Sequence, residues 1–148
     1  MAGWAGAQDR FVGHVRRLCA PAGGRQPLIA ALGYRLLEAS ETEVELAAPV
    51  SDSSLQVDGW VHGGMLATLA DTAGAYLLYR SLPPDRSMTS IEFKLNFLRP
   101  AVADAGDLSA RARLVKQGRQ VALCDIEVAQ GGELVAKGLF TYLLLPPD

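Results

Sequence analysis

The chain has 148 residues, of which 49% are hydrophobic and 20% are charged, a composition typical of one globular domain with a substantial core. Its formal net charge is −2 and it contains no basic block, so we predict neither a nucleic-acid partner nor a membrane-surface partner. The two cysteines, Cys19 and Cys124, are too few for a disulfide framework, and no His or Cys pair has metal-ligand spacing. We therefore predict no metal site.

The first 27 residues differ in pattern from the rest of the chain. Apolar residues recur at helical spacing over residues 9–19, which predicts a short helix, and a Pro- and Gly-rich stretch over 21–27 ends it. We interpret residues 1–27 as a helix and linker and residues 28–148 as the main domain. Residues 1–8 lack the positive charge that opens a secretory signal peptide, and no apolar run follows them, so we expect a cytoplasmic protein.

Two extended stretches are predicted next, over residues 31–49, with a connection near 40–42. In the second stretch Glu43 and Glu45 alternate with Val44 and Leu46, as in a half-buried strand. Residues 51–61 are rich in Ser, Asp and Gly and are typical of a loop. The segment 63–80 is long and apolar, and Pro83 and Pro84 follow it, which predicts a helix that ends there.

The remainder of the chain predicts sheet. Apolar and polar residues alternate over 91–97, and further strands are expected over 107–116, 120–129 and 134–145, with turns at 116–119 and 130–133. One helix followed by tight hairpins favours an α+β fold in which a mostly antiparallel sheet covers one side of that helix. Because the helix is apolar nearly all round, its other side also needs a cover, and we expect a second copy of the chain there.

Asp71 is a charged residue at the centre of the apolar helix, a position that apolar residues usually occupy. A charge in a lone membrane span is costly, so the helix is interpreted as buried within a soluble protein, and a buried carboxylate itself needs a partner. Its neighbours along the helix face are mostly small, which allows a second helix or a ligand to approach the backbone. These neighbours are Gly64, Ala67, Thr68, Gly74, Ala75 and Leu78.

The triplet His62-Gly63-Gly64 stands where this helix is expected to begin. Free N–H groups and the positive end of the helix dipole at that point favour a developing negative charge, and a carboxylate with such an oxyanion site can transfer an acyl group to water. Seven residues of helix separate Gly64 from Asp71 by ~10 Å, too far for one site. Two helices packed antiparallel would bring Asp71 of one copy near Gly64 of the other.

These residues resemble a known family signature. Gln56-Val-Asp-Gly-Trp-Val-His62-Gly63-Gly64 with Asp71 nine residues after the His is similar to the motif of hotdog-fold thioesterases of the phenylacetic-acid-degradation type. The segment 93–100 and Gly118-Arg119 are similar to strand landmarks of that family, and the resemblance covers roughly residues 28–145. It implies an α+β hotdog fold, in which a mostly antiparallel sheet wraps a long central helix, preceded by a short N-terminal helix.

The resemblance also implies hydrolysis of acyl-CoA thioesters, without metal or organic cofactor. Asp71 corresponds to the general base or nucleophile, Gly64 to the oxyanion N–H donor, and His62 to a residue that shapes the loop or contacts substrate. A strand hydroxyl that orients water corresponds to Ser90, with Thr89 as the alternative. The family has Asn where this chain has Gln56, so that contact is expected to be displaced by one methylene.

Substrate contacts and alternative functions stay open. Gly63 and Thr68 are expected to bind substrate, and the CoA phosphates have three candidate partners: Arg99, Lys116 and Arg119. We expect a dimer, assembled further as a dimer of dimers. One alternative function is a non-catalytic acyl-CoA-binding hotdog protein, and another is a hotdog dehydratase that acts on hydroxyacyl thioesters. An assay separates the three functions: a thioesterase releases free thiol from acyl-CoA, a dehydratase removes water, and a binding protein does neither.

Overall fold

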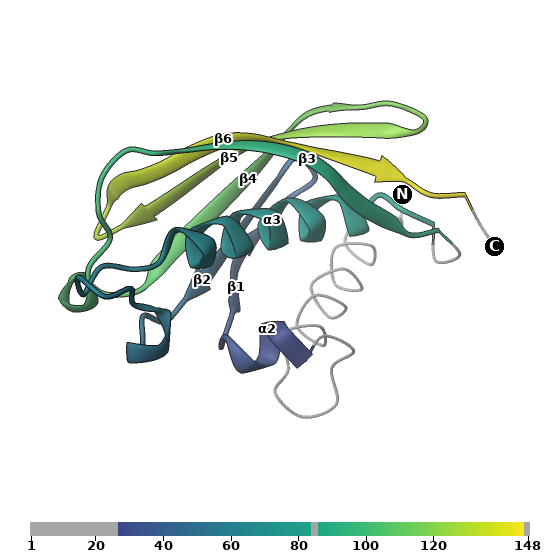
Figure 1. The fold of residues 1–148 in the computed structure, drawn as a ribbon. Helices are drawn as coiled ribbons and strands as arrows, with labels where there is room; N and C mark the ends of the chain where they lie inside the picture. Colours follow the sequence, from purple (N-terminus) through teal and green to yellow (C-terminus); the bar gives the residue numbers. More distant parts are fainter. Residues whose placement is uncertain (1–26, 84–85, 147–148) are drawn as a thin grey trace.

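The computed structural model describes residues 27–83 and 86–146, which form one curved sheet around one long helix (Figure 1). The helix predicted over 9–19 lies outside the described residues. The helices and strands, with their bounds, are α2 (Pro27–Ala31), β1 (Arg35–Ala39), β2 (Glu43–Ala48), α3 (Gly63–Tyr79), β3 (Met88–Phe97), β4 (Leu108–Gln117), β5 (Val121–Gln130) and β6 (Glu133–Leu144). Short 3-10 turns occupy Asp52–Ser54 and Ala103–Ala105. The predicted long helix and strands are confirmed. The short helix α2 was not predicted, and it takes up the end of the Pro- and Gly-rich stretch over 21–27 and the beginning of the extended stretch predicted from residue 31.

The six strands form one sheet in the order β1-β2-β4-β5-β6-β3, and every pair is antiparallel. The hairpins β4–β5 and β5–β6 join strands that are neighbours in the chain. Gly131 and Gly132 both have positive φ in the second of these turns, as a two-residue hairpin requires. In contrast, β3 crosses the molecule to pair with β6 and forms an edge of the sheet. This crossover brings β3 beside the helix that precedes it in the chain.

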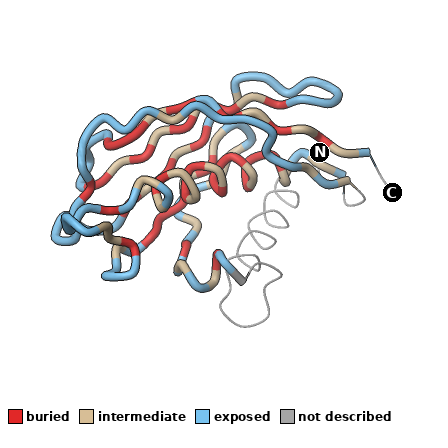
Figure 2. The backbone as a smooth tube through the Cα atoms, in the orientation of Figure 1, coloured by how far each residue is buried: buried red, intermediate tan, exposed pale blue. Residues whose placement is uncertain are grey.

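The core lies between α3 and the concave face of the sheet (Figures 1 and 2). Along β5, buried and half-buried residues alternate from Ala122 to Gln130, because one strand face packs on the helix and the other is hydrated. Leu66, Leu69 and Leu77 of α3 are buried against this face. The apolar residues of the alternating pattern therefore mainly face the helix, and the polar residues mainly face the outer side of the same sheet.

The outer face of the sheet carries ion pairs between charged residues of neighbouring strands. Arg111 pairs with Glu45 at 2.6 Å, and Arg113 pairs with Glu43 at 2.7 Å. Lys137 donates to Glu127 over 2.7 Å, and this hydrogen bond holds the pKa of the Glu127 carboxyl below its usual value. Positive and negative charges of neighbouring strands thus face one another on this side of the sheet.

One side of α3 is left incompletely covered by its own sheet. Gly64 is exposed and Ala67, Thr68, Asp71 and Ala75 are only half-buried, and these residues fall on one helical stripe. Two residues that the sequence placed on this stripe lie elsewhere, because Gly74 and Leu78 are buried on the sheet side. The uncovered stripe consists of small residues around a single carboxylate.

Candidate active site

Asp71 is held by a residue of the neighbouring edge strand. The Ser90 hydroxyl donates to Asp71 Oδ1 over 2.6 Å, a charge-assisted bond that fixes the orientation of the carboxylate. The second oxygen, Oδ2, has no hydrogen-bond partner among residues 27–83 and 86–146. A carboxylate with one oxygen fixed and the other free, half-buried beside a stripe of small residues, is arranged to accept a proton or to attack an electrophile.

A β-bulge brings Ser90 to the helix side of β3. Phe93 faces the helix side, where its ring stacks on buried Phe140 with the centroids 4.8 Å apart. Strict alternation from Phe93 would place Ile91 and Thr89 on the same side. The register shifts between Ser90 and Glu92, however, so that Ile91 is an extra residue and the side-chain directions before it are reversed.

The two candidate hydroxyls therefore have different surroundings. Ser90 is opposite Tyr142, whose buried side chain faces the helix, whereas Thr89 is opposite half-buried Leu143. Among the described residues, the Thr89 hydroxyl donates only to the carbonyl of Ser90, at 3.5 Å. Of the two residues that the sequence left open, Ser90 is the one in contact with Asp71.

The loop triplet forms the start of α3, as predicted. His62 is the N-cap residue, and its Nδ1 accepts a hydrogen bond from the Gly64 N–H over 2.9 Å. The N–H that the family resemblance assigns to the oxyanion is therefore bonded to the His62 ring in the single chain. Since His62 is exposed, this acceptor can rotate away without disturbing the core. Thr68 donates to the Gly64 carbonyl over 2.8 Å, which ties the first helical turn together.

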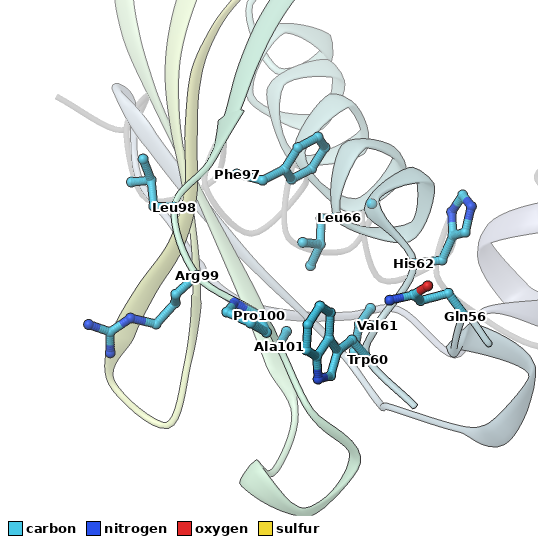
Figure 3. Close-up of a pocket in the computed structure, with 11 residues that line it drawn as sticks. Gln56, Trp60, Val61, His62, Leu66, Phe97, Leu98, Arg99, Pro100 and Ala101 are labelled. Atoms are coloured by element: carbon cyan, nitrogen blue, oxygen red, sulfur yellow. The ribbon is translucent and has the colours of Figure 1, made fainter. Parts of the chain in front are cut away.

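A cavity of about 530 Å³ lies beside this helix start (Figure 3). Its walls are largely apolar and include Trp60, Leu66 and Phe97, while Gln56 and the His62-Gly63 segment contribute polar groups. The Gln56 side-chain amide points into the cavity and has no hydrogen-bond partner in the described part of the chain (Figure 3). A cavity of this size, with apolar walls and a few polar groups, suits a small organic ligand.

Gly63 packs directly against the cavity wall. A Cβ at this position would lie 3.1 Å from the nearest atom of the Phe97 ring. The glycine thus brings the backbone of the helix start close to the ring that ends β3. Sequence reasoning did not find Phe97 or Trp60 as cavity residues. The structure leaves both large aromatic side chains about half-exposed, as is common at a ligand or partner surface.

The three candidates for CoA phosphates do not lie together in one chain. Arg99 is at the cavity but extends away from it and forms an ion pair with Glu133 (Figure 3). Lys116 and Arg119 flank the β4–β5 turn, whose Gln117 accepts a hydrogen bond from Ser81 just beyond the end of α3. These cations therefore lie at opposite ends of α3.

The expected site residues fall into two groups within a single chain. Gln56, His62 and Gly63, together with Arg99, lie around the cavity, whereas Asp71 and Ser90 lie further along the helix. Over the ranges that the structure describes, no cluster of three His, Cys, Asp or Glu side chains is suited to a metal ion. Within the same ranges, no helix is long and apolar enough to span a membrane.

Comparison with known proteins identifies the family. The sequence model of the Thioesterase superfamily matches residues 58–137, more than half of the chain, including the helix start, Asp71 and Ser90. The chain belongs to the thioesterase superfamily. A relative from Halobacterium salinarum, named as an esterase, is 35% identical over 106 residues, which make up 68% of each protein.

Other relatives agree with this assignment. The acyl-coenzyme A thioesterase PaaI of Escherichia coli is 36% identical over 100 residues, 66% of this chain and 67% of that protein. The solved structure of E. coli PaaI superposes with a TM-score of 0.76 at 27% identity, covering 84% of this chain and 88% of that one. The predicted hotdog fold and the predicted enzyme class, a thioesterase, are confirmed.

Proposed function

We propose that this thioesterase-superfamily member hydrolyses acyl-CoA thioesters to a free acid and CoA, with Asp71 as general base or nucleophile. The observation that carries the proposal is the half-buried carboxylate in the middle of an apolar helix, bonded to Ser90 and with one oxygen free. Desolvation makes a carboxylate more reactive, and the Ser90 bond holds it in one orientation. The Ser90 hydroxyl also lies where it can orient an attacking water.

The proposed site is shared between two copies of the chain. Within one chain, Asp71 and Gly64 are separated by ~10 Å of helix, and Asp71 does not line the cavity. The small-residue stripe on α3 allows a second helix to approach closely. If the two helices pack antiparallel, Asp71 and Ser90 of one copy face the helix start and the cavity of the other. Each of two equivalent sites then contains both groups.

The edge strand β3 supports the same assembly. It pairs on one side only, with β6, and Ile91, Phe93 and Phe97 are about half-exposed along it. An unpaired edge with large apolar side chains is a surface for another strand. The opposite face of the sheet carries ion pairs, such as Arg111 with Glu45 and Lys137 with Glu127. We therefore propose that the dimer forms through β3 and the stripe on α3, and that any dimer of dimers is built from this unit.

In the proposed mechanism the thioester carbonyl replaces His62 as the acceptor of the Gly64 N–H. The N-terminus of α3 has a positive partial charge, which stabilises the oxyanion that forms when water or Asp71 attacks. The exposed His62 ring turns aside and remains a contact for the loop or the substrate. No step requires a metal or an organic cofactor.

We assign the cavity to the apolar part of the substrate. Trp60, Leu66 and Phe97 provide the walls, and the unpaired amide of Gln56 is available to a polar atom of the acyl group or of the thioester. Gly63 and Thr68 lie along the path from the cavity to the helix stripe. The CoA phosphates are assigned to Arg99 from one copy and Lys116 or Arg119 from the other, because antiparallel helices bring opposite ends together.

The proposed function is tested by measuring free thiol release from acetyl-, hexanoyl-, palmitoyl-, isovaleryl- and phenylacetyl-CoA. We expect release from at least one of them, and release that is lower by roughly 10²–10⁴-fold with the Asp71→Asn variant. A hotdog dehydratase would instead remove water from a 3-hydroxyacyl-CoA, and a non-catalytic binding protein would bind acyl-CoA without either product. Thiol release that is equal in the wild type and in Asp71→Asn would contradict the proposal.

A further inference from the structure

Tyr142 connects the sheet to the backbone of Asp71. It is fully buried on β6, and its phenol donates to the Asp71 carbonyl oxygen over 3.0 Å. A carbonyl in the interior of a helix already accepts the N–H four residues later, so this bond uses its second lone pair. Neither the family resemblance nor the sequence pattern assigned any role to this residue.

Gly74 provides the space for this bond. A Cβ on Gly74 would lie 2.1 Å from the Tyr142 oxygen and 2.8 Å from Cζ, so no other residue is accommodated while the phenol keeps its place. Glycine in a helix interior destabilises by ~1 kcal/mol relative to alanine. The sequence placed Gly74 on the small-residue face toward a partner, but the structure shows that it faces the phenol.

Tyr142 and Ser90 act on the same residue from paired strands. They are direct partners in the β3–β6 register. The Ser90 hydroxyl bonds to the Asp71 carboxylate and the Tyr142 hydroxyl bonds to the Asp71 carbonyl, so both ends of Asp71 are attached to one rigid element. Burial raises the pKa of the Tyr142 phenol, and the nearby Asp71 charge raises it further, so the phenol remains a proton donor at any working pH.

We propose that Tyr142 is a positioning residue for Asp71, which it prevents from shifting along or around the helix axis relative to the sheet. This inference rests on the proposed function, in which Asp71 acts on the thioester. Ser90 alone fixes only the end of a side chain, whereas the carbonyl bond fixes the backbone from which the side chain extends. A misplacement of about 1 Å can lower the rate of an oriented reaction by about 10²-fold.

The test compares two variants that each remove one buried phenol oxygen from the full-length chain. Tyr142→Phe removes the bond to Asp71. Tyr34→Phe is the matched control, since Tyr34 is equally buried and its hydroxyl has no hydrogen-bond partner among residues 27–83 and 86–146. With hexanoyl-CoA and phenylacetyl-CoA as probes, we expect kcat of Tyr142→Phe to fall about tenfold with KM unchanged. Tyr34→Phe should keep the wild-type kcat.

A third measurement separates positioning from a structural role. In an Asp71→Asn background, Tyr142→Phe should cause no further loss of the residual rate, because there is no carboxylate left to position. A further loss in that background, or a Tyr142→Phe chain that does not fold, would show a structural role and overturn the inference. If Tyr142→Phe keeps the wild-type kcat while Asp71→Asn loses its activity, this inference is overturned and the proposed function stands. If Asp71→Asn itself keeps its activity, the proposed function is overturned.

Discussion

Ser90 Oγ lies 2.6 Å from Asp71 Oδ1, and this contact joins the middle of the long helix to the edge strand of the sheet. It exists because β3 carries one extra residue, Ile91, which turns Ser90 toward the helix. The orientation of the carboxylate therefore depends on the register of β3 against β6. A change that removed the bulge would turn Thr89 inward instead.

The first prediction concerns the carboxylate. Asp71→Asn should lower kcat by roughly 10²–10⁴-fold, since the amide keeps the size and the hydrogen bond to Ser90 but cannot act as a base or nucleophile. Binding of acyl-CoA should survive, as measured by titration with a slowly hydrolysed substrate. Retention of most of the turnover on the best acyl-CoA would contradict the assignment of Asp71.

A second prediction separates the two hydroxyls of β3. Ser90→Ala should lower kcat, because the Asp71 carboxylate loses the hydrogen bond that fixes it. Thr89→Ala is the matched control and should leave kcat within about twofold, since the hydroxyl of Thr89 contacts only a neighbouring carbonyl. The measurement is the steady-state kcat of the two variants with the same acyl-CoA. Equal losses would mean that the bulge does not determine the site.

The helix cap gives a third prediction. His62→Ala removes the acceptor of the Gly64 N–H and should lower the free energy of unfolding by ~1 kcal/mol, measured by urea denaturation. His62→Asn is the control, because Asn is a strong N-cap residue and should retain most of the stability. If both variants lost the same stability, the His62 side chain would not be acting as a cap.

We also expect activity to be independent of metal ions. The proposed chemistry uses a carboxylate and backbone N–H groups, so prolonged dialysis against EDTA should leave thiol release unchanged. Loss of activity under these conditions, with recovery on addition of Zn²⁺ or Mg²⁺, would show that a metal takes part.

The final prediction tests the shared site by complementation. Asp71→Ala removes the carboxylate, and Gly64→Pro removes the N–H that we propose stabilises the oxyanion. Proline is tolerated in the first turn of a helix. Each variant alone should be inactive, whereas co-refolding should restore activity. In the mixed dimer, one of the two sites combines the intact Gly64 of one variant with the intact Asp71 of the other.

The controls for this experiment concern folding and mixing. Gly64→Pro also removes the cap bond to His62, so circular dichroism must show a folded helix before the assay. Two different affinity tags, purified in sequence, isolate the mixed dimers. Folded mixed dimers without activity would show that Asp71 and Gly64 do not share a site across the interface.

The sequence by itself determined the elements of this protein and singled out the residues of its candidate site. Periodicity of two and of 3.6 residues is a local property, so the long helix and the strands after it could be predicted from their own residues. Asp71 was conspicuous because an isolated charge in an apolar helix has few structural explanations. The His62-Gly63-Gly64 triplet could be placed at the helix start from its spacing alone.

Only the tertiary structure decided how these elements meet. The pairing of β3 with β6, and the bulge that selects Ser90 over Thr89, depend on contacts between segments distant in the chain, which no local pattern encodes. The same holds for Tyr142, an ordinary strand residue in sequence whose phenol reaches Asp71 because Gly74 leaves space for it. Side-chain spacing along one segment reveals which face a residue occupies, but the partner on that face is set by the packing of the whole chain.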